Sequence, residues 1–216
     1  MPRISLLFIL FLFIICVNGQ NYNEPKAKEI IQKSVAKSKT YKSYKVDFKY
    51  TLENKMDSVK TVQTGSIYLK EGKFKLSLGD QVIISDNKTV WIYLKNANEV
   101  QMNTYNPDEL EINPNDIFIM WEKGYKSGYV GEQNLNGKVV DLIELTPIDK
   151  TVDFFKVKLY INRLTRMIDK MQTYYKNSNI VTFDIKNFTP NIVLGDGFFK
   201  FDPSKYPGIQ VIDLRE

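Results

Sequence analysis

The chain has 216 residues, of which 43% are hydrophobic and 25% charged, a composition typical of a folded globular protein. Its 30 basic and 25 acidic residues are scattered along the chain, which argues against a nucleic-acid partner. The chain contains no histidine, and Cys16 is its single cysteine. A histidine general base, a Cys/His dyad and a zinc site made of His and Cys are therefore excluded.

Residues 1–19 are predicted to form a cleavable signal peptide. Arg3 gives a positive start, and residues 4–17 are apolar except for one serine. This apolar run is shorter than the roughly 20 residues that a bilayer-spanning helix needs. Gly19 is small enough for cleavage after it. We therefore expect export and a single mature domain over residues 20–216.

Cys16 offers an alternative, because an exported bacterial protein can be acylated on a cysteine near its start. The preceding residues 13–15 are Phe, Ile and Ile, however, and lack the small residue expected before an acylated cysteine. We therefore favour a free, exported form over a membrane-tethered one. Without Cys16 the mature chain has no disulfide, so its core alone must stabilise the fold.

The mature chain begins with a predicted amphipathic helix and continues with alternating strands. In residues 25–37, proline occupies the first position, and apolar residues recur at spacings of three and four. From Tyr41 the period changes to two, which indicates a half-buried strand. One face of this strand carries Tyr44, Val46, Phe48, Tyr50 and Leu52, and the other carries Lys45, Asp47, Lys49 and Thr51.

Further alternating segments follow at residues 59–69 and 73–78, separated by short turns rich in Gly and Asn. Such brief links favour an antiparallel up-and-down meander over parallel βαβ units. The pattern is interrupted where Pro107 and Pro114 each follow an asparagine, which predicts two short helices. The second would carry Ile117, Phe118, Met120 and Trp121 and end at Gly124.

Strands are predicted again in the second half of the chain, at residues 128–133, 138–145, 154–161, 167–175, 180–188, 199–201 and 209–212. This makes about eleven strands and two helical regions, with no linker, so the fold class is mainly β with a few helices (α+β). A long antiparallel sheet must curl to protect its edges, and the apolar helix is the simplest element to fill the concave face.

Several motifs, in order along most of the chain, resemble one known family. Residues 65–76 contain its first strand pair, and residues 84–93 (ISDNKTVWIY) resemble its S-D-G-K-x-x-W-x-Y hairpin. Residues 145–147 fit its L-x-P strand end, and residues 199–203 and 208–213 are similar to its F-x-F-x-P and G-x-x-V-x-D ending. These motifs resemble the periplasmic outer-membrane lipoprotein carrier (LolA) family. The resemblance implies an incomplete antiparallel β-barrel with a helical lid over a hydrophobic cavity.

This chain departs from the family pattern in three places. Glu71 and Gly72 stand where many members have Arg and Pro, so a lid-holding arginine is not carried over to this position. Asn87 replaces the hairpin glycine, and asparagine also tolerates positive φ, so we expect the turn to survive. About two extra residues near 204–206 lengthen the loop before the last strand.

A carrier of acyl chains needs apolar surface and no catalytic group, cofactor or metal. We expect the cavity wall to include Val46, Phe48, Tyr50, Leu52, Ile67, Leu69, Phe74, Leu76, Trp91 and Tyr93, and the lid to include Ile117, Phe118, Met120 and Trp121. The alternative is that these residues are ordinary core between sheet and helices, because the same alternation builds any β-structure. The strand of Trp91 and Tyr93 is apolar on both faces, so its orientation stays open.

The resemblance implies a monomeric carrier of acylated lipoproteins. An ATP-driven inner-membrane transporter would release lipoproteins to it, and an outer-membrane receptor, where one is present, would accept them. Two alternatives share the fold: a carrier of free lipid or a lipid-linked pigment, and a lipid-sensing regulatory protein. An enzyme is not expected, because G-x-S-x-G, S-x-x-K and a Gly-rich phosphate loop are all missing.

Overall fold

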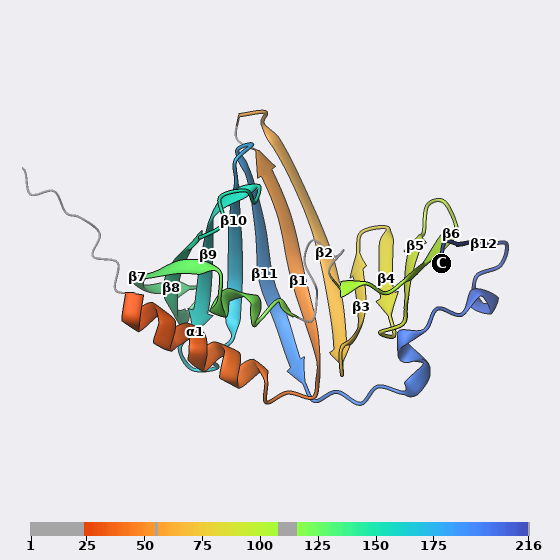
Figure 1. Cartoon of the computed structure of the whole chain (residues 1–216), viewed down its shortest axis with the longest axis horizontal. Coiled ribbons are helices and arrows are strands. Elements are labelled where there is room, and N and C mark those ends of the chain that lie inside the picture. The colour runs from red at the N-terminus through yellow and green to blue at the C-terminus, as the bar shows by residue number, and fades with distance from the viewer. Residues whose placement is uncertain (1–23, 55, 108–115, 216) are drawn as a thin grey trace, which may run out of the picture.

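The computed structural model describes residues 24–54, 56–107 and 116–215, which form one open β-sheet with one α-helix against it (Figure 1). The expected signal peptide and the expected helix after Pro107 lie outside the described residues. In the described part of the chain, the sheet has twelve strands, against about eleven expected from the sequence. Its terminal strands are not paired with each other, so the barrel is incomplete, as expected.

Helix α1 (Glu24–Ser38) confirms the amphipathic helix expected at the start of the mature chain. The apolar side chains of Ala27, Ile30, Ile31 and Val35 are buried, because spacings of three and four place them on one face of the helix. These four residues belong to the main hydrophobic core together with residues from the curved part of the sheet. The helix thus covers one side of the concave face.

The sheet is built from two antiparallel meanders rather than from the single meander expected. The first contains β1 (Ser43–Asn54), β2 (Val59–Lys70), β3 (Lys73–Leu78), β4 (Gln81–Ser85), β5 (Thr89–Leu94) and β6 (Glu99–Thr104). The second contains β7 (Tyr125–Leu135), β8 (Lys138–Pro147), β9 (Phe154–Asn162), β10 (Ile168–Tyr175) and β11 (Asn179–Pro190). Strands β1 and β11 pair antiparallel and join the two meanders, with Val46 opposite Phe188.

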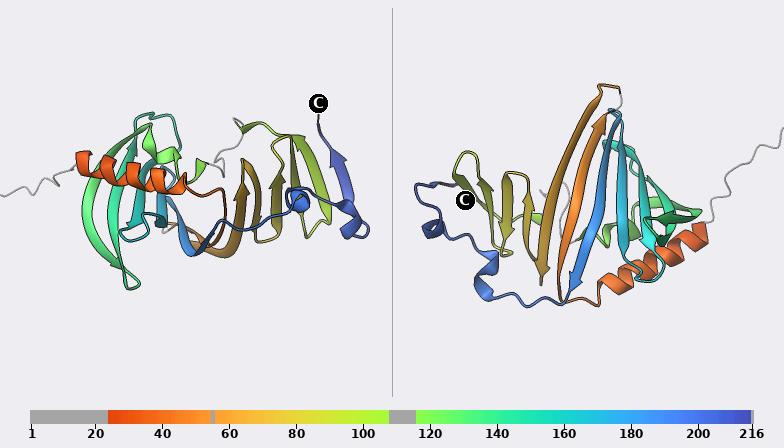
Figure 2. Two further views of the ribbon diagram at one scale, coloured as in Figure 1. Left: turned by 90° about the horizontal axis from the view of Figure 1, so that it is seen from below. Right: turned by 180° about the vertical axis from the view of Figure 1, so that it is seen from behind.

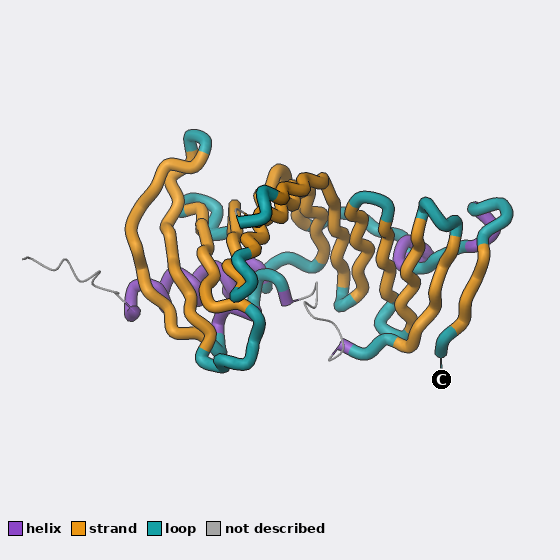
Figure 3. Tube along the Cα trace, turned by 90° about the horizontal axis from the view of Figure 1, so that it is seen from above, coloured by secondary structure: helices purple, strands orange, loops and turns teal. Residues whose placement is uncertain are grey.

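The two ends of the sheet differ in shape. Strands β7 to β11 curve beside α1, whereas β3 to β6 extend away from the helix as a flatter wing (Figures 2 and 3). At the edge of this wing, β12 (Gln210–Asp213) pairs with β6 in parallel. The expectation of a purely antiparallel sheet is therefore wrong at this edge, because the chain crosses the wing before forming its last strand.

Two other expectations are corrected by the structure. Residues 199–201 are not a strand: the 3₁₀ helix η4 (Asp196–Phe199) leads into an extended segment, and Phe199 and Phe201 are buried against the sheet. The apolar helix expected to end at Gly124 is only the short 3₁₀ helix η3 (Met120–Glu122) preceded by turns. In both segments, packing of large apolar side chains outweighs the local pattern.

The two faces of the sheet bury different residues. The concave face packs against α1 and residues 117–121 in the main core. The opposite, convex face of the wing carries a second cluster that contains Ile84, Trp91 and Val100 and is covered by Phe199 and Phe201. Since neighbouring residues of a strand point to opposite faces, β4 contributes Ile83 to the first cluster and Ile84 to the second.

Candidate functional site

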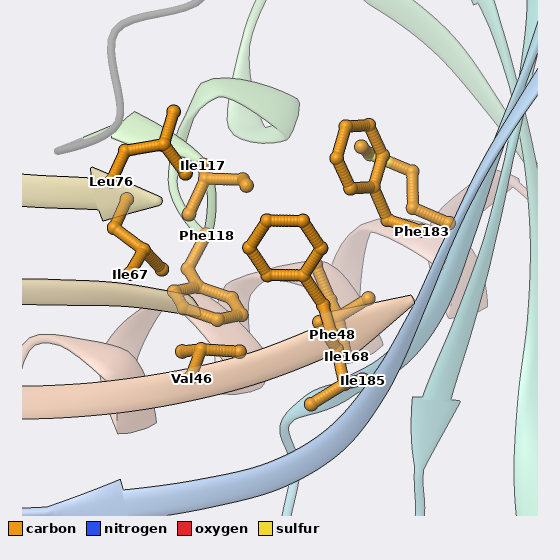
Figure 4. Close-up of a pocket in the computed structure, with 10 residues that line it drawn as sticks. Val46, Phe48, Ile67, Leu76, Ile117, Phe118, Ile168, Phe183 and Ile185 are labelled. Carbon is orange, nitrogen blue, oxygen red and sulfur yellow. The ribbon is translucent and has the colours of Figure 1, made fainter. Parts of the chain in front are cut away.

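An apolar cavity of about 140 Å³ lies on the concave face, between the sheet and the segment that follows β6. Side chains from β1, β2, β3, β10 and β11 point into it together with two residues of that segment (Figure 4). The wall consists only of aliphatic, aromatic and thioether side chains, namely Val46, Phe48, Ile67, Leu76, Ile117, Phe118, Ile168, Met171, Phe183 and Ile185.

Strand pairing brings the cavity wall together from distant parts of the sequence. Val46 lies opposite Ile67, and Ile67 lies opposite Leu76, so these three side chains form a row across β1, β2 and β3. Phe48 lies opposite Ile185 of β11, and its ring is 5.6 Å from that of Phe183. Because cross-strand neighbours on one face lie about 5 Å apart, each row forms a continuous apolar surface.

The segment of residues 116–122, which we call the strap, covers this cavity. The Trp121 indole Nε1 donates a hydrogen bond to the carbonyl oxygen of Ile117 over 2.9 Å, which closes the turn. The Phe118 ring lies 5.7 Å from that of Tyr44 and 6.1 Å from that of Phe188, both in edge-to-face geometry. The strap is therefore attached to the sheet mainly by aromatic packing.

One titratable group lies at this attachment. Burial raises the pKa of the Tyr44 hydroxyl to about 12, and the nearby carboxylate of Asp116 on the strap adds to the shift. Both effects disfavour the phenolate, the first by removing water and the second by repulsion. Tyr44 is thus neutral at ordinary pH and presents an uncharged ring to Phe118.

The structure brings six of the fourteen expected site residues together around the cavity: Val46, Phe48, Ile67, Leu76, Ile117 and Phe118. Leu69 and Phe74 are buried in the main core at 3% and 1% exposure and do not line the cavity. Tyr50 and Leu52 line a separate, more polar hollow beside Tyr175. Met120 and Trp121 of the expected lid line another hollow next to the cavity.

The expectation that Trp91 and Tyr93 share this cavity is wrong. Both belong to the second cluster on the convex face, where the Tyr93 ring lies 5.4 Å from that of Phe201 and 4.7 Å from that of Tyr206. Strand β5 is apolar on both faces because the C-terminal segment covers the convex side of the wing. The alternation within β5 alone cannot reveal this cover.

Four wall residues were missed by the sequence reasoning: Ile168, Met171, Phe183 and Ile185. They lie on β10 and β11, two strands that the sequence does predict. In β10 the strand pairing is irregular between Ile168 and Lys170, and in β11 it is irregular opposite Phe48 of β1. The simple alternation of inward and outward side chains is therefore broken in both strands. Val46 and Phe48 face the cavity, so the residues that pair with them mark the inward face of β11. The sequence alone does not predict that β1 and β11 are neighbours.

The cavity can hold hydrocarbon but is unsuited to ordinary catalysis. Its lining provides no nucleophile, acid or base. In residues 24–107 and 116–215, apart from residue 55, no group of three or more His, Cys, Asp or Glu residues is placed to hold a metal ion. The same part of the chain has no helix long and apolar enough to cross a membrane.

Comparison with known proteins agrees with this geometry. Residues 39–202 match the family model described as "Outer membrane lipoprotein carrier protein LolA". A curated relative, the uncharacterized protein MJ0687 of Methanocaldococcus jannaschii, is 28% identical over 206 residues, or 92% of this chain. The chain spans 58% of that relative's length.

Two solved structures share the fold at low sequence identity. An uncharacterized conserved protein from Thermus thermophilus has a TM-score of 0.57 and 13% identity, covering 87% of this chain and 99% of that one. LprF from Mycobacterium bovis has a TM-score of 0.52 and 14% identity, covering 81% and 98%. The open sheet, the covered apolar cavity and the match over residues 39–202 lead to one conclusion: this chain belongs to the LolA family of outer membrane lipoprotein carrier proteins.

Proposed function

We propose that this protein is a non-catalytic periplasmic carrier that binds the acyl chains of lipoproteins released from the inner membrane and delivers them to the outer membrane. The observation that carries the proposal is the wholly apolar cavity beneath the strap, in a chain of the lipoprotein-carrier family. In this proposal residues 1–19 are removed on export, and residues 20–216 act as a single, monomeric carrier domain.

Hydrocarbon burial supplies the binding energy in this proposal. Each methylene moved from water into an apolar site contributes about 0.8 kcal/mol, so a 14-carbon chain represents on the order of 10 kcal/mol. The cavity of about 140 Å³ is close in size to one that binds a benzene ring. A whole acyl chain therefore requires more of the concave face than this cavity provides.

The same energy explains why partners are needed. An acylated protein does not leave a membrane unaided when its chains together gain tens of kcal/mol there. We propose that an ATP-driven inner-membrane transporter loads the carrier, and that an outer-membrane receptor or direct insertion unloads it. The strap would then cover the cavity whenever no acyl chain occupies it.

Native mass spectrometry of the full chain, expressed with its leader and purified after export, tests the proposal. We expect a bound mass that extraction identifies as an acylated protein. A bound free lipid would instead identify the alternative cargo, with the same cavity. If no mass is bound and added acylated peptides do not bind, the proposal is wrong and the cavity is only an imperfection of the core.

Two variants of one strand provide a matched comparison. Ile185 points into the cavity, whereas Ile180 lies on the opposite face of β11, and both side chains are partly buried. Ile185→Gln places an amide in the hydrocarbon site and should lower affinity for an acylated peptide about tenfold or more. Ile180→Gln should leave binding unchanged, and equal losses in the two variants would contradict the assignment of the site.

A further inference from the structure

A second, larger hollow adjoins the cavity on the concave face, and we call it the second chamber. Its volume is about 380 Å³, against about 140 Å³ for the cavity. Four aromatic residues form much of its wall: Trp121, Tyr125, Phe154 and Tyr175. Their rings follow one another with centroid distances of 5.6, 6.4 and 6.1 Å. Asp153 and Thr173 also line the second chamber, which is otherwise apolar or aromatic and borders the cavity.

The same strap covers both spaces. Ile117 and Phe118 line the cavity, and Met120 and Trp121, two residues further along, line the second chamber. A movement of the strap that opens the cavity would therefore open the second chamber as well. This arrangement explains why only half of the expected lid residues lie at the cavity.

One side chain is shared by the walls of the two spaces. Met171 of β10 lines both the cavity and the second chamber and is only 4% exposed. Methionine is unbranched and has three rotatable side-chain bonds, so it can change its shape without a backbone movement. The side chain that borders both spaces is therefore able to change rotamer.

We propose that an acyl chain longer than the cavity continues past Met171 into the second chamber, and that Met171 determines which chain lengths are held tightly. This inference rests on the proposed function and specifies where the rest of the chain lies. A cavity of this size is filled by about a six-carbon fragment. The larger volume of the second chamber is sufficient for the remaining carbons of a common acyl chain.

Saturated fatty acids of 6 to 16 carbons, kept below their aggregation concentrations, are suitable probes. Binding to the full mature protein is measured by isothermal titration calorimetry. We expect affinity to rise roughly fourfold for each added methylene while a space is filling. A weaker rise is expected where the chain must displace Met171, followed by a renewed rise. In Met171→Ala this weak interval should disappear, whereas Met171→Leu preserves the volume and should retain it.

A second variant fills the second chamber without changing Met171. Val152 lies in the turn before β9 and lines this chamber with partial exposure, so a tryptophan there requires little rearrangement of the core. We expect Val152→Trp to lower the affinity for a 12-carbon fatty acid by about tenfold or more compared with its effect on the affinity for a six-carbon fatty acid. Phe155→Trp is the matched control, since Phe155 is 50% exposed and lines neither space.

The outcomes separate this inference from the proposed function. If no fatty acid binds at any length and acylated peptides do not bind, the proposed function itself fails. If long chains bind tightly and neither Met171→Ala nor Val152→Trp changes the dependence on length, the chain leaves the cavity elsewhere, and the inference is wrong. A brominated fatty acid gives an independent readout: bromine near the tail should quench Trp121, and Trp91 is removed beforehand by Trp91→Phe.

Discussion

Gly65 of β2 is the position where one added methyl group should disturb the cavity most directly. It lies opposite Phe48 of β1, and the Phe48 ring rests over it. A Cβ atom at position 65 would lie 2.5 Å from Cζ of Phe48 and 2.8 Å from the carbonyl oxygen of Ser77. Ordinary contacts between carbon atoms are 3.5–4.0 Å, so the ring must move by about 1 Å. The Ser77 carbonyl belongs to the β2–β3 pairing and cannot move independently.

We therefore expect Gly65→Ala to lower the free energy of unfolding by about 1–3 kcal/mol, the usual cost of overpacking. Phe48 lines the cavity, so a ring displaced into this space should also weaken the binding of acyl chains. Urea unfolding gives the first quantity and fatty-acid titration the second. Gly195→Ala is the control, because its added methyl group meets nothing within 4 Å and its φ of −72° suits alanine.

A double-mutant cycle tests the physical cause. Phe48→Leu shortens the side chain above Gly65, so the combined variant should be more stable than the sum of the two single changes implies, by at least about 0.5 kcal/mol. Part of the cost should remain, because the contact with the Ser77 carbonyl is unaffected. If Gly65→Ala is as stable as the parent protein, or the cycle shows no coupling, the close approach of Phe48 is not a constraint on this fold.

Three further predictions concern other parts of the molecule. Tyr44 has a pKa of about 12 against an ordinary value of 10, so its contribution to stability is complete below pH 10 and is lost as pH rises through 12. Between pH 9 and pH 11, the free energy of unfolding measured with urea should therefore fall by about 1.4 kcal/mol more in the parent protein than in Tyr44→Phe. Equal decreases in the two proteins would contradict this prediction. Phe199→Ala should lower the free energy of unfolding, measured by thermal or urea unfolding, by about 3–5 kcal/mol. Its affinity for fatty acids should be unchanged, and an altered affinity would refute the separation of the two faces of the sheet. Asn87, at φ 72°, donates a side-chain hydrogen bond to the Glu71 carbonyl; Gly and Ala both lose this bond, but only Ala adds strain at positive φ, so the free energy of unfolding should be about 1–2 kcal/mol lower for Asn87→Ala than for Asn87→Gly, and equal unfolding midpoints of these two variants would be the contrary result.

The sequence predicts those parts of the fold that depend on local pattern. Alternation over residues 44–52 identifies β1 and its inward face, and Val46 and Phe48 indeed line the cavity. The helix at residues 25–37 follows from its apolar spacing and its first proline. Asn87 adopts the positive φ that the hairpin turn requires, as expected for a replacement of glycine. In each case the backbone preference and the burial of side chains favour the same structure.

The sequence fails where distant segments decide the outcome. The pairing of β1 with β11 joins residues more than a hundred positions apart and brings Phe183 and Ile185 to the cavity. Coverage of the convex face by residues 199–206 gives β5 a second buried face, which its own alternation cannot assign. The strap forms only a short 3₁₀ helix, and within it Phe118 lines the cavity whereas Trp121 lines the second chamber, a division that local periodicity does not reveal.

The strap and an acyl chain compete for the same surface, and their energies can be compared. Phe118 gains about 1.5–3 kcal/mol from burial, and its edge-to-face contacts with Tyr44 and Phe188 add about 0.5–1.5 kcal/mol each. The total of roughly 2.5–6 kcal/mol is smaller than the value of about 10 kcal/mol for a 14-carbon chain. Such a chain can therefore displace Phe118 and still bind, whereas a six-carbon chain, at about 5 kcal/mol, gains no clear surplus over this cost and is expected to occupy only the existing cavity. When no acyl chain is bound, Phe118 is then the apolar group that covers the cavity in the proposed carrier.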